Sequence, residues 1–308
     1  MELGAPGGVG FGVFGDHGLF LPLDDGFYAP DPNADPARFL ARFETIAAQP
    51  PPPDTRILLG PLFDAFPRAS FVDVGAYVGA VYVPALKLIA ARGEDRAALA
   101  LEPGPSRSLI EHSLSANRLA GPISDAAAGV VSGPVFLWTP AGGGIAARLG
   151  VPQAPTAPRQ IVRAALLSEE LNRFGITGDL ILKVDVEGAE AAVLDGLPNW
   201  DRIRAALLEA WPEALRADHH GQSFAETLIA RFVVYDIGDT LAPRYVRRLA
   251  TVEAMLAAAH AQPRGNTDLL LIAREERDAQ AAVEARAEPI AAQAARFTAR
   301  FWSRPGAP

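Results

Sequence analysis

The sequence predicts an α/β protein built on a doubly wound, mainly parallel sheet. Short runs of branched apolar residues recur along the chain, and segments with helical periodicity alternate with them. Several of the apolar runs are followed directly by an acidic residue. The clearest run begins at Leu180 and turns abruptly into Lys183, Asp185, Glu187, Gly188 and Glu190. A continuous apolar run indicates a strand that is buried on both faces, as in a parallel sheet covered by helices.

Length, composition and charge narrow the class of protein. The 308 residues are 49% hydrophobic and 21% charged, which indicates a globular chain with a substantial core. The net charge is −8 and the arginines are scattered, so we expect no nucleic-acid partner. The absence of cysteine excludes disulfides and a thiol nucleophile. No lysine or arginine precedes Arg38 and no apolar run approaches about 20 residues, so we expect a cytoplasmic protein without a signal peptide or a membrane span.

Residues 1–69 are expected to form an N-terminal extension before a main domain at 70–273. We predict two short strands around an Asp-Gly turn within 19–28, a helix that starts at 35–36 and ends before Pro50, and a second helix over about 57–66. Residues 274–308 are expected to form a C-terminal helix, interrupted near Pro289, and a flexible tail. This helix either packs on its own domain or pairs with a second subunit. The sequence therefore leaves a homo-oligomer as one of two alternatives.

The first chemical signal lies in the turn after a predicted strand at 70–74. The turn contains Gly75, Tyr77 and Gly79, and a helix follows to about residue 91. Glycines at a strand-to-helix turn let the backbone approach a ligand, and the helix start directs its amides toward it. The turn therefore predicts a nucleotide-cofactor loop, although Tyr77 breaks the Gly-x-Gly-x-x-Gly dinucleotide pattern. A tight packing turn is the structural alternative.

Two further acidic residues, Glu102 and Asp125, lie after or within the next predicted strands. Glu102 ends the strand at 97–101 and is placed to accept hydrogen bonds from ribose hydroxyls. Strands are also predicted at 123–126 and 130–138. Asp125 lies where an adenine amino group could be read, or is a plain turn residue.

The second half of the chain repeats the pattern. We predict a loop at 139–160, a helix at 160–174, and strands at 205–209, 232–237 and 268–273, with a helix over 244–261. The last two strands are expected to form a closing antiparallel pair. Asp73, Glu102, Asp185 and Glu209 all fall at the carboxyl ends of strands, where doubly wound sheets bind their ligands.

These segments resemble the FkbM-type methyltransferases, which depend on S-adenosylmethionine. The matching segments are 71–76 with Gly79, Glu102-Pro103 with Asn117, 182–190 with 193–196, and Leu208-Glu209. The resemblance implies a class I methyltransferase fold, which is a Rossmann-like seven-stranded sheet. Tyr77 stands where the family usually has Asn, Tyr82 where Thr or Ser is common, and Leu167 where a Thr-Leu-Asp segment would end.

The family implies transfer of a methyl group to a hydroxyl of a small molecule, a sugar or a polyketide-like acceptor. It assigns the 73–79 loop to the methionine part of the cofactor and Glu102 to its ribose. The expected cofactor-binding residues are Asp73, Gly75, Ala76, Tyr77, Gly79, Glu102, Pro103 and Asp125.

Asp185 is the best-placed acid to remove the proton of an acceptor hydroxyl. Lys183, Glu187 and His219 complete the candidate catalytic set. His219 and His220 follow the Glu209 strand and supply a general base or a solvated loop pair. Glu187 is alternatively a partner of Lys183, and Glu190 a charge stabilised by the start of a helix.

Asp185 and Glu209 also suggest a divalent ion such as Mg²⁺, since they end successive strands as in cation-dependent O-methyltransferases. Carboxylates at neighbouring strand ends also occur without metal. Two other functions stay open at this stage, a catalytically silent cofactor-binding or scaffold protein and a nicotinamide-dependent oxidoreductase.

Overall fold

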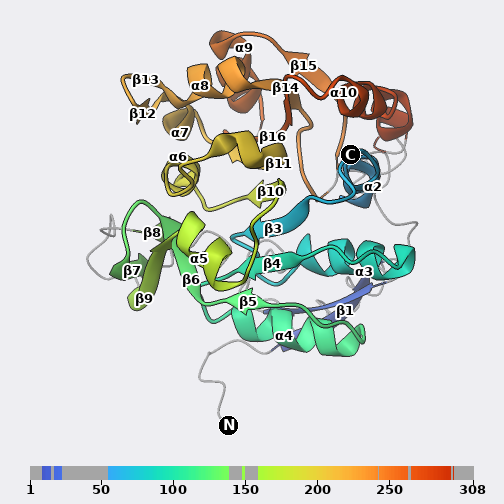
Figure 1. Cartoon of the computed structure of the whole chain (residues 1–308), viewed down its shortest axis with the longest axis vertical. Coiled ribbons are helices and arrows are strands. Elements are labelled where there is room, and N and C mark those ends of the chain that lie inside the picture. The colour runs from blue at the N-terminus through green and yellow to red at the C-terminus, as the bar shows by residue number, and fades with distance from the viewer. Residues whose placement is uncertain are drawn as a thin grey trace, which may run out of the picture.

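A large twisted sheet organises the chain, with helices on both of its faces (Figure 1). The computed structural model describes residues 9–14, 17–22, 55–138, 148–149, 159–241, 243–262, 265–292 and 294. The helix expected at 35–47 lies outside these residues, as does most of the loop expected at 139–160.

The large sheet has the order β15-β14-β16-β11-β10-β3-β4-β5. Its strands are β3 (Ser70–Val74), β4 (Ala98–Leu101), β5 (Ile123–Ser124), β10 (Leu180–Val184), β11 (Ile203–Ala210), β14 (Phe232–Asp236), β15 (Arg247–Leu249) and β16 (Thr267–Ala273). The strands from β5 to β11 are parallel, whereas β16 runs antiparallel to both of its neighbours. The predicted closing pair is therefore confirmed as β14 and β16.

The eighth strand, β15, corrects the prediction of seven strands and of one helix over 244–261. Residues 247–249 pair antiparallel with β14. Helix α9 (Val252–His260) begins only after Thr251, whose side chain accepts a hydrogen bond from the amide of Ala254. Threonine is a favourable N-cap, so the helix starts there and leaves the preceding residues free to extend the sheet.

Alternate side chains of the central strands enter two separate hydrophobic layers. In β10, Ile181 belongs to one layer, whereas Leu180, Leu182 and Val184 belong to the other. This is the two-residue period of a strand with helices on both faces. The first layer is covered by α2 (Arg56–Ala65), α3 (Tyr82–Arg92), α4 (Arg107–Ala116) and α10 (Arg277–Glu284). The second is covered by α5 (Leu167–Arg173), α6 (Glu190–Asp195), α7 (Pro212–Arg216), α8 (Phe224–Arg231) and α9.

A smaller sheet of order β6-β9-β7-β8 lies next to α5 and α6 (Figure 1). Its strands are β6 (Ala126–Gly129), β7 (Gly133–Trp138), β8 (Arg148–Leu149) and β9 (Arg159–Leu166). The helix predicted at 160–174 was wrong over its first half. Strand β9 pairs with both β6 and β7, which satisfies the backbone groups that a helix would have satisfied internally.

The N-terminal hairpin forms earlier in the sequence than predicted. Strands β1 (Val9–Phe14) and β2 (His17–Pro22) pair antiparallel around residues 15–16, and β2 runs beside α4. The Asp-Gly turn expected after residue 23 lies outside the described residues.

The last residues that the structure describes are helical. Helix α10 stops at Glu284, and the chain turns at 285–286 before helix resumes at 287. The predicted interruption therefore lies just before Pro289, which is tolerated in the first turn of the second helix. Leu58 and Phe63 of α2 and Val283 of α10 are fully buried in the first layer. The division of the chain into two extensions and a main domain stays a prediction.

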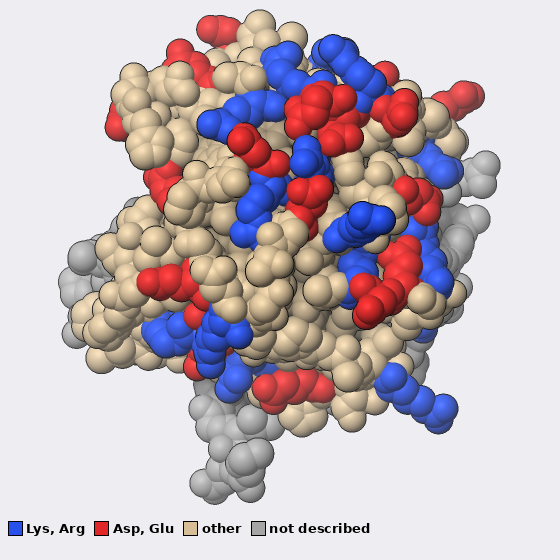
Figure 2. Space-filling model, in the orientation of Figure 1, with Lys and Arg blue, Asp and Glu red and all other residues tan. Residues whose placement is uncertain are grey.

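Acidic and basic side chains are interspersed on the face of the molecule that Figure 2 shows. Among the described residues, no helix combines the length and apolar character that crossing a bilayer requires.

We expect Gly196→Ala to lower the free energy of unfolding by about 1–3 kcal/mol, because the new methyl group would overpack the junction of α6 with the smaller sheet. A Cβ at this position would lie 2.4 Å from the carbonyl oxygen of Gly129 and 3.0 Å from the amide nitrogen of Leu167. Urea denaturation measures the change. Gly178→Ala is the matched control, since a Cβ there meets nothing within 4 Å. Equal stability of the two variants would contradict the prediction.

Candidate functional site

The loop after β3 lies tightly against the end of β10. Gly75, Tyr77 and Gly79 have φ values of 77°, 51° and 84°. A Cβ on Gly75 would lie 1.9 Å from the carbonyl oxygen of Asp185, so only glycine fits at this position. The left-handed conformation of Tyr77 is one that Asn adopts more readily, which accounts for the Asn that the family usually has at this position. The amides of Gly75 and Ala76 both donate to the carbonyl oxygen of Leu101, which fixes the loop to the end of β4.

Glu102 closes the other side of this loop. Its Oε2 accepts a hydrogen bond of 2.8 Å from the amide of Tyr77, and its Oε1 accepts one of 2.8 Å from the amide of Gly104. Only 8% of Glu102 is exposed. Burial raises the pKa of Glu102 to about 7, although the Gly104 amide works in the opposite direction. Glu102 is therefore a desolvated carboxylate held at the edge of the loop, and its contact with a ribose stays a prediction.

Gly104 is a site residue that the sequence analysis missed. A Cβ there would lie 2.7 Å from Oε1 of Glu102, so a larger residue at this position would displace the end of that side chain. The signal was present in the segment Glu102-Pro103-Gly104, where a glycine follows the predicted acidic strand end by two residues. Pro103 lies between the two and makes the turn that brings the Gly104 amide back to the carboxylate.

The buried side chain of Lys183 connects the ends of β3 and β10. Its Nζ lies 3.3 Å from Oδ1 of Asp73 and 3.2 Å from Oδ2 of Asp185, and it donates a hydrogen bond of 2.8 Å to the carbonyl oxygen of Gly75. Lys183 and Asp73 are direct partners in the parallel pairing of the two strands. Burial opposes the charge of Lys183, yet Asp185 and Asp73 together raise the pKa of its ammonium group. Burial raises the pKa of Asp73, and Lys183 partly offsets this effect.

Three carboxylates meet where β10 and β11 end. Ligand oxygens of Asp185, Glu187 and Glu209 all lie within 4.8 Å of one another. Glu209 is 9% exposed and accepts a hydrogen bond of 2.7 Å from the indole nitrogen of Trp211. Burial and the nearby charges of Asp185 and Glu187 raise the pKa of Glu209 well above its usual range. The structure thus brings together the predicted pair of Asp185 and Glu209, and an oxygen-only donor set of this kind suits a hard divalent ion.

Glu190 has a structural position in this loop. It is the first residue of α6, and its Oε1 accepts hydrogen bonds from the amides of Gly188 and Val186 at 2.9 and 3.3 Å. The carboxylate holds the turn in which Glu187 and Gly188 have positive φ values of 57° and 103°. Burial raises the pKa of Glu190 to about 7.

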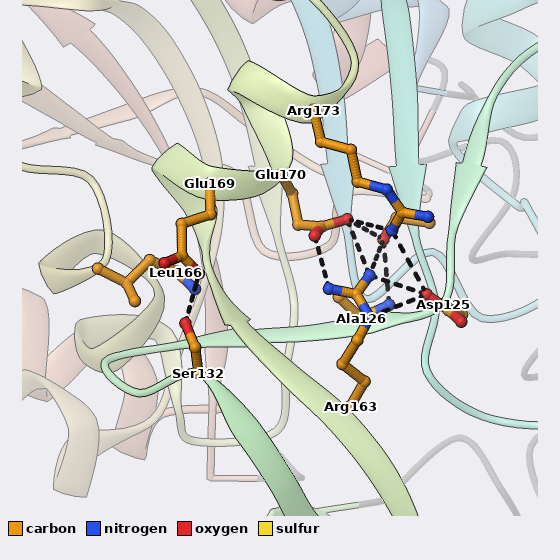
Figure 3. Close-up of polar contacts among 9 residues, drawn as sticks. Asp125, Ala126, Ser132, Arg163, Leu166, Glu169, Glu170 and Arg173 are labelled. Carbon is orange, nitrogen blue, oxygen red and sulfur yellow. Dashed lines mark hydrogen bonds and ion pairs between the residues drawn. The ribbon is translucent and has the colours of Figure 1, made fainter.

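Asp125 directly follows β5, but arginines hold its carboxylate (Figure 3). Arg163 of β9 donates to Oδ1 of Asp125 at 2.8 Å, and Arg173 of α5 lies at 3.8 Å. The hydrogen bond with Arg163 lowers the pKa of Asp125. Arg163 also pairs at 2.7 Å with Glu170, whose side chain is 2% exposed. The adenine contact of Asp125 stays a prediction.

Residues 73–223 match the model of the methyltransferase FkbM domain. The matched stretch contains the loop after β3, Glu102, Lys183 and the three carboxylates. These residues form an FkbM methyltransferase domain. The resemblance that the sequence showed is thereby confirmed, and β14, β15 and β16 complete the large sheet beyond the matched stretch. No curated protein matches the chain.

Two solved structures from Burkholderia thailandensis are similar to parts of the chain. One is an uncharacterised protein at 15% identity, with a TM-score of 0.25, and the match covers 74% of this chain and 60% of that one. The other, described as a "likely methyl transferase" bound to S-adenosyl-homocysteine, has 14% identity and a TM-score of 0.25, with coverage of 74% and 58%. The match thus covers less than two thirds of each protein's length, and at this TM-score neither bears on the function of the FkbM domain.

His219 does not join the carboxylates of the FkbM domain. Its ring lies 4.9 Å from that of Trp200, which precedes the amino end of β11, whereas Asp185 follows the carboxyl end of β10. The sequence places His219 only ten residues after Glu209, but α7 intervenes and carries the chain back along the sheet. The structure therefore gives no geometric support to His219 as a general base for this site.

We expect Lys183→Met to lower the free energy of unfolding by about 3–5 kcal/mol, because it leaves the buried carboxylate of Asp73 without its cation. Urea denaturation measures the change, and Lys87→Met, at the only other lysine, is the control. Adding Asp73→Asn to Lys183→Met should recover part of the lost stability, since it removes the buried charge. A loss below about 1 kcal/mol in Lys183→Met, typical of an exposed pair, would show that the ion pair does not hold the two strand ends.

Proposed function

We propose that the chain transfers the methyl group of S-adenosylmethionine to a hydroxyl oxygen of a small-molecule acceptor. The methyltransferase FkbM domain supports the class of reaction. The observation that carries the choice of cofactor is the position of Glu102, a buried carboxylate at the end of β4 that is hydrogen-bonded to the glycine loop after β3.

The residues around this loop fit such a cofactor. Each oxygen of the Glu102 carboxylate accepts one backbone amide and keeps a lone pair that can accept a ribose hydroxyl. Gly75 and Gly79 have positive φ values, and protein atoms of Asp185 and of Val83 and Ile110 occupy the space that a side chain would need, so the glycines shape a tight loop that would hold the methionine part. When bound, the cofactor supplies an electrophilic methyl group on a positively charged sulfur.

Asp185 is the residue that we assign to remove the proton of the acceptor. Its side chain is 42% exposed, so an acceptor can reach it, and Lys183 holds the carboxylate at 3.2 Å. Lys183 thus positions Asp185 from the buried side. Glu187 lies next to it on a backbone turn with positive φ and adds negative charge at the same edge of the sheet. A hydroxyl that donates its proton to Asp185 becomes a better nucleophile toward the methyl group.

A metal-assisted form of the same reaction is the second candidate, and the meeting of Asp185, Glu187 and Glu209 favours it. These three residues would hold Mg²⁺ through carboxylate oxygens. A divalent ion there would lower the pKa of a bound acceptor hydroxyl.

Calorimetric titration of the full chain with S-adenosylhomocysteine tests the proposal. We expect binding that weakens at least about tenfold in Glu102→Ala, because hydrogen bonds to a charged acceptor are lost. Glu111→Ala, on the exposed surface of α4, is the matched control. Preferential binding of NAD would instead support an oxidoreductase, and tight binding with no turnover of any hydroxylated acceptor would support a silent cofactor-binding protein. Stronger binding of a catechol-type acceptor in Mg²⁺ than in chelator would favour the metal-assisted form.

The affinity for S-adenosylhomocysteine should rise about tenfold between pH 6 and pH 8. Burial raises the pKa of Glu102 to about 7, so the carboxyl group is largely protonated at pH 6 and ionised at pH 8. Only the ionised form accepts hydrogen bonds at all four lone-pair positions, so raising the pH strengthens binding. Glu102→Gln, which is neutral at every pH, should bind weakly with a flat profile. An equally steep profile in this variant would assign the pH dependence to another group.

A further inference from the structure

A second cluster of potential metal ligands lies on the helical face behind the sheet. The strands β12 (Asp218–His219) and β13 (Gln222–Ser223) form a short hairpin that we call the histidine hairpin, residues 218–223. It packs against the end of α6, where Asp195 is the last helical residue. His219, His220 and Asp195 each offer one ligand atom, and these atoms all lie within 4.8 Å of one another.

The distances within the cluster are short. Nδ1 of His219 lies 2.7 Å from Oδ1 of Asp195, and Nε2 of His220 lies 3.7 Å from the same oxygen. The two imidazole rings are 4.6 Å apart between centroids. Ligands bound at about 2.0–2.2 Å to one tetrahedral ion lie about 3.3–3.6 Å apart. The 3.7 Å separation matches this spacing, whereas the 2.7 Å pair has to open by less than about 1 Å when an ion binds.

Within the described residues, the polar atoms at the centre of the cluster contact one another but form no hydrogen bond. His219 is 6% exposed, and neither its Nδ1 nor Oδ1 of Asp195 makes a hydrogen bond despite their short separation. Nδ1 of His219 and Oδ1 of Asp195 are close enough for a hydrogen bond, but the N–H direction is not aligned with the oxygen, so no hydrogen bond forms. A metal ion between them would satisfy both lone pairs without that alignment.

The surroundings hold one histidine rigidly and leave the other accessible. The His219 ring packs on Trp200 at 4.9 Å and on Phe224 at 5.8 Å. His220 is 82% exposed and begins a two-residue turn with Gly221, in which both φ values are positive. An ion can therefore enter from solvent on the His220 side and meet a preformed pair of ligands.

We propose that His219, His220 and Asp195 bind a divalent transition-metal ion of the zinc class, with water in the fourth position. Two imidazole nitrogens favour zinc, nickel or copper over magnesium, in contrast to the oxygen-only set of Asp185, Glu187 and Glu209. The ion ties the histidine hairpin to α6, whose first residue, Glu190, holds the turn after β10. The site is structural and does not depend on the methyl-transfer proposal.

Equilibrium dialysis of the full chain, without a histidine tag, against Zn²⁺ in excess Mg²⁺ tests this site. The magnesium occupies oxygen-only sites and leaves nitrogen-containing sites to zinc. We expect one zinc ion per chain, and an affinity at least tenfold lower in His220→Ala. Because His220 is exposed, its removal leaves the core packing intact. His260→Ala, which removes an exposed imidazole from α9, is the matched control and should bind as the wild type does.

Asp195→Asn provides a second variant, because it keeps the size of the side chain and a hydrogen-bond acceptor while it removes the charge. We expect it to weaken zinc binding at least tenfold, and we expect Zn²⁺ to raise the melting temperature of the wild type but not of His220→Ala. With Co²⁺ as the probe, the wild type should show the visible absorption of a tetrahedral site. Absence of zinc binding, or equal binding by the wild type and His220→Ala, would overturn the proposal.

Discussion

The buried ion bridge of Lys183 is the interaction on which the candidate site depends. It joins Asp73 at the end of β3 to Asp185 at the end of β10, and it also holds the carbonyl oxygen of Gly75. A buried carboxylate without a cation would be costly, so the charge on Lys183 is what allows Asp73 to occupy a fully buried position. Because one ammonium group holds both strand ends, the glycine loop and the β10 turn are fixed relative to each other.

The other acidic side chains of the candidate site, Glu102, Glu190 and Glu209, lie near the strand ends that Lys183 joins. Glu102 and Glu190 each use their carboxylates to accept backbone amides, one beside the glycine loop and one within the β10 turn. Burial raises the pKa of both to about 7. Glu209 is buried among Asp185 and Glu187 and has a raised pKa for the same reason and because of their charge. Negative charge concentrated at this edge suits a positively charged sulfonium or a divalent ion.

The polar network of Asp125, Arg163, Glu170 and Arg173 connects the two sheets. Arg163 extends from β9 of the smaller sheet to Asp125 at the end of β5 and to Glu170 of α5 (Figure 3). The carboxylate of Glu170 is almost fully buried and accepts a further hydrogen bond from Ser124. The smaller sheet thereby contributes a charge beside Asp125, for which the sequence offered an adenine contact or a plain turn residue.

The sequence by itself determined the parallel strands and the acids at their ends. Runs such as 180–184 specify buried strands, and parallel strands place their carboxyl ends at one edge, so the meeting of Asp185 and Glu209 followed from order along the chain. Only the tertiary structure decided that Arg159–Leu166 is a strand, because pairing with two neighbours outweighs local helix preference. It also decided that Lys183 bridges Asp73 and that His219 lies far along the sheet from Glu209. Such contacts depend on register and on the path of the intervening helices, which no local pattern encodes.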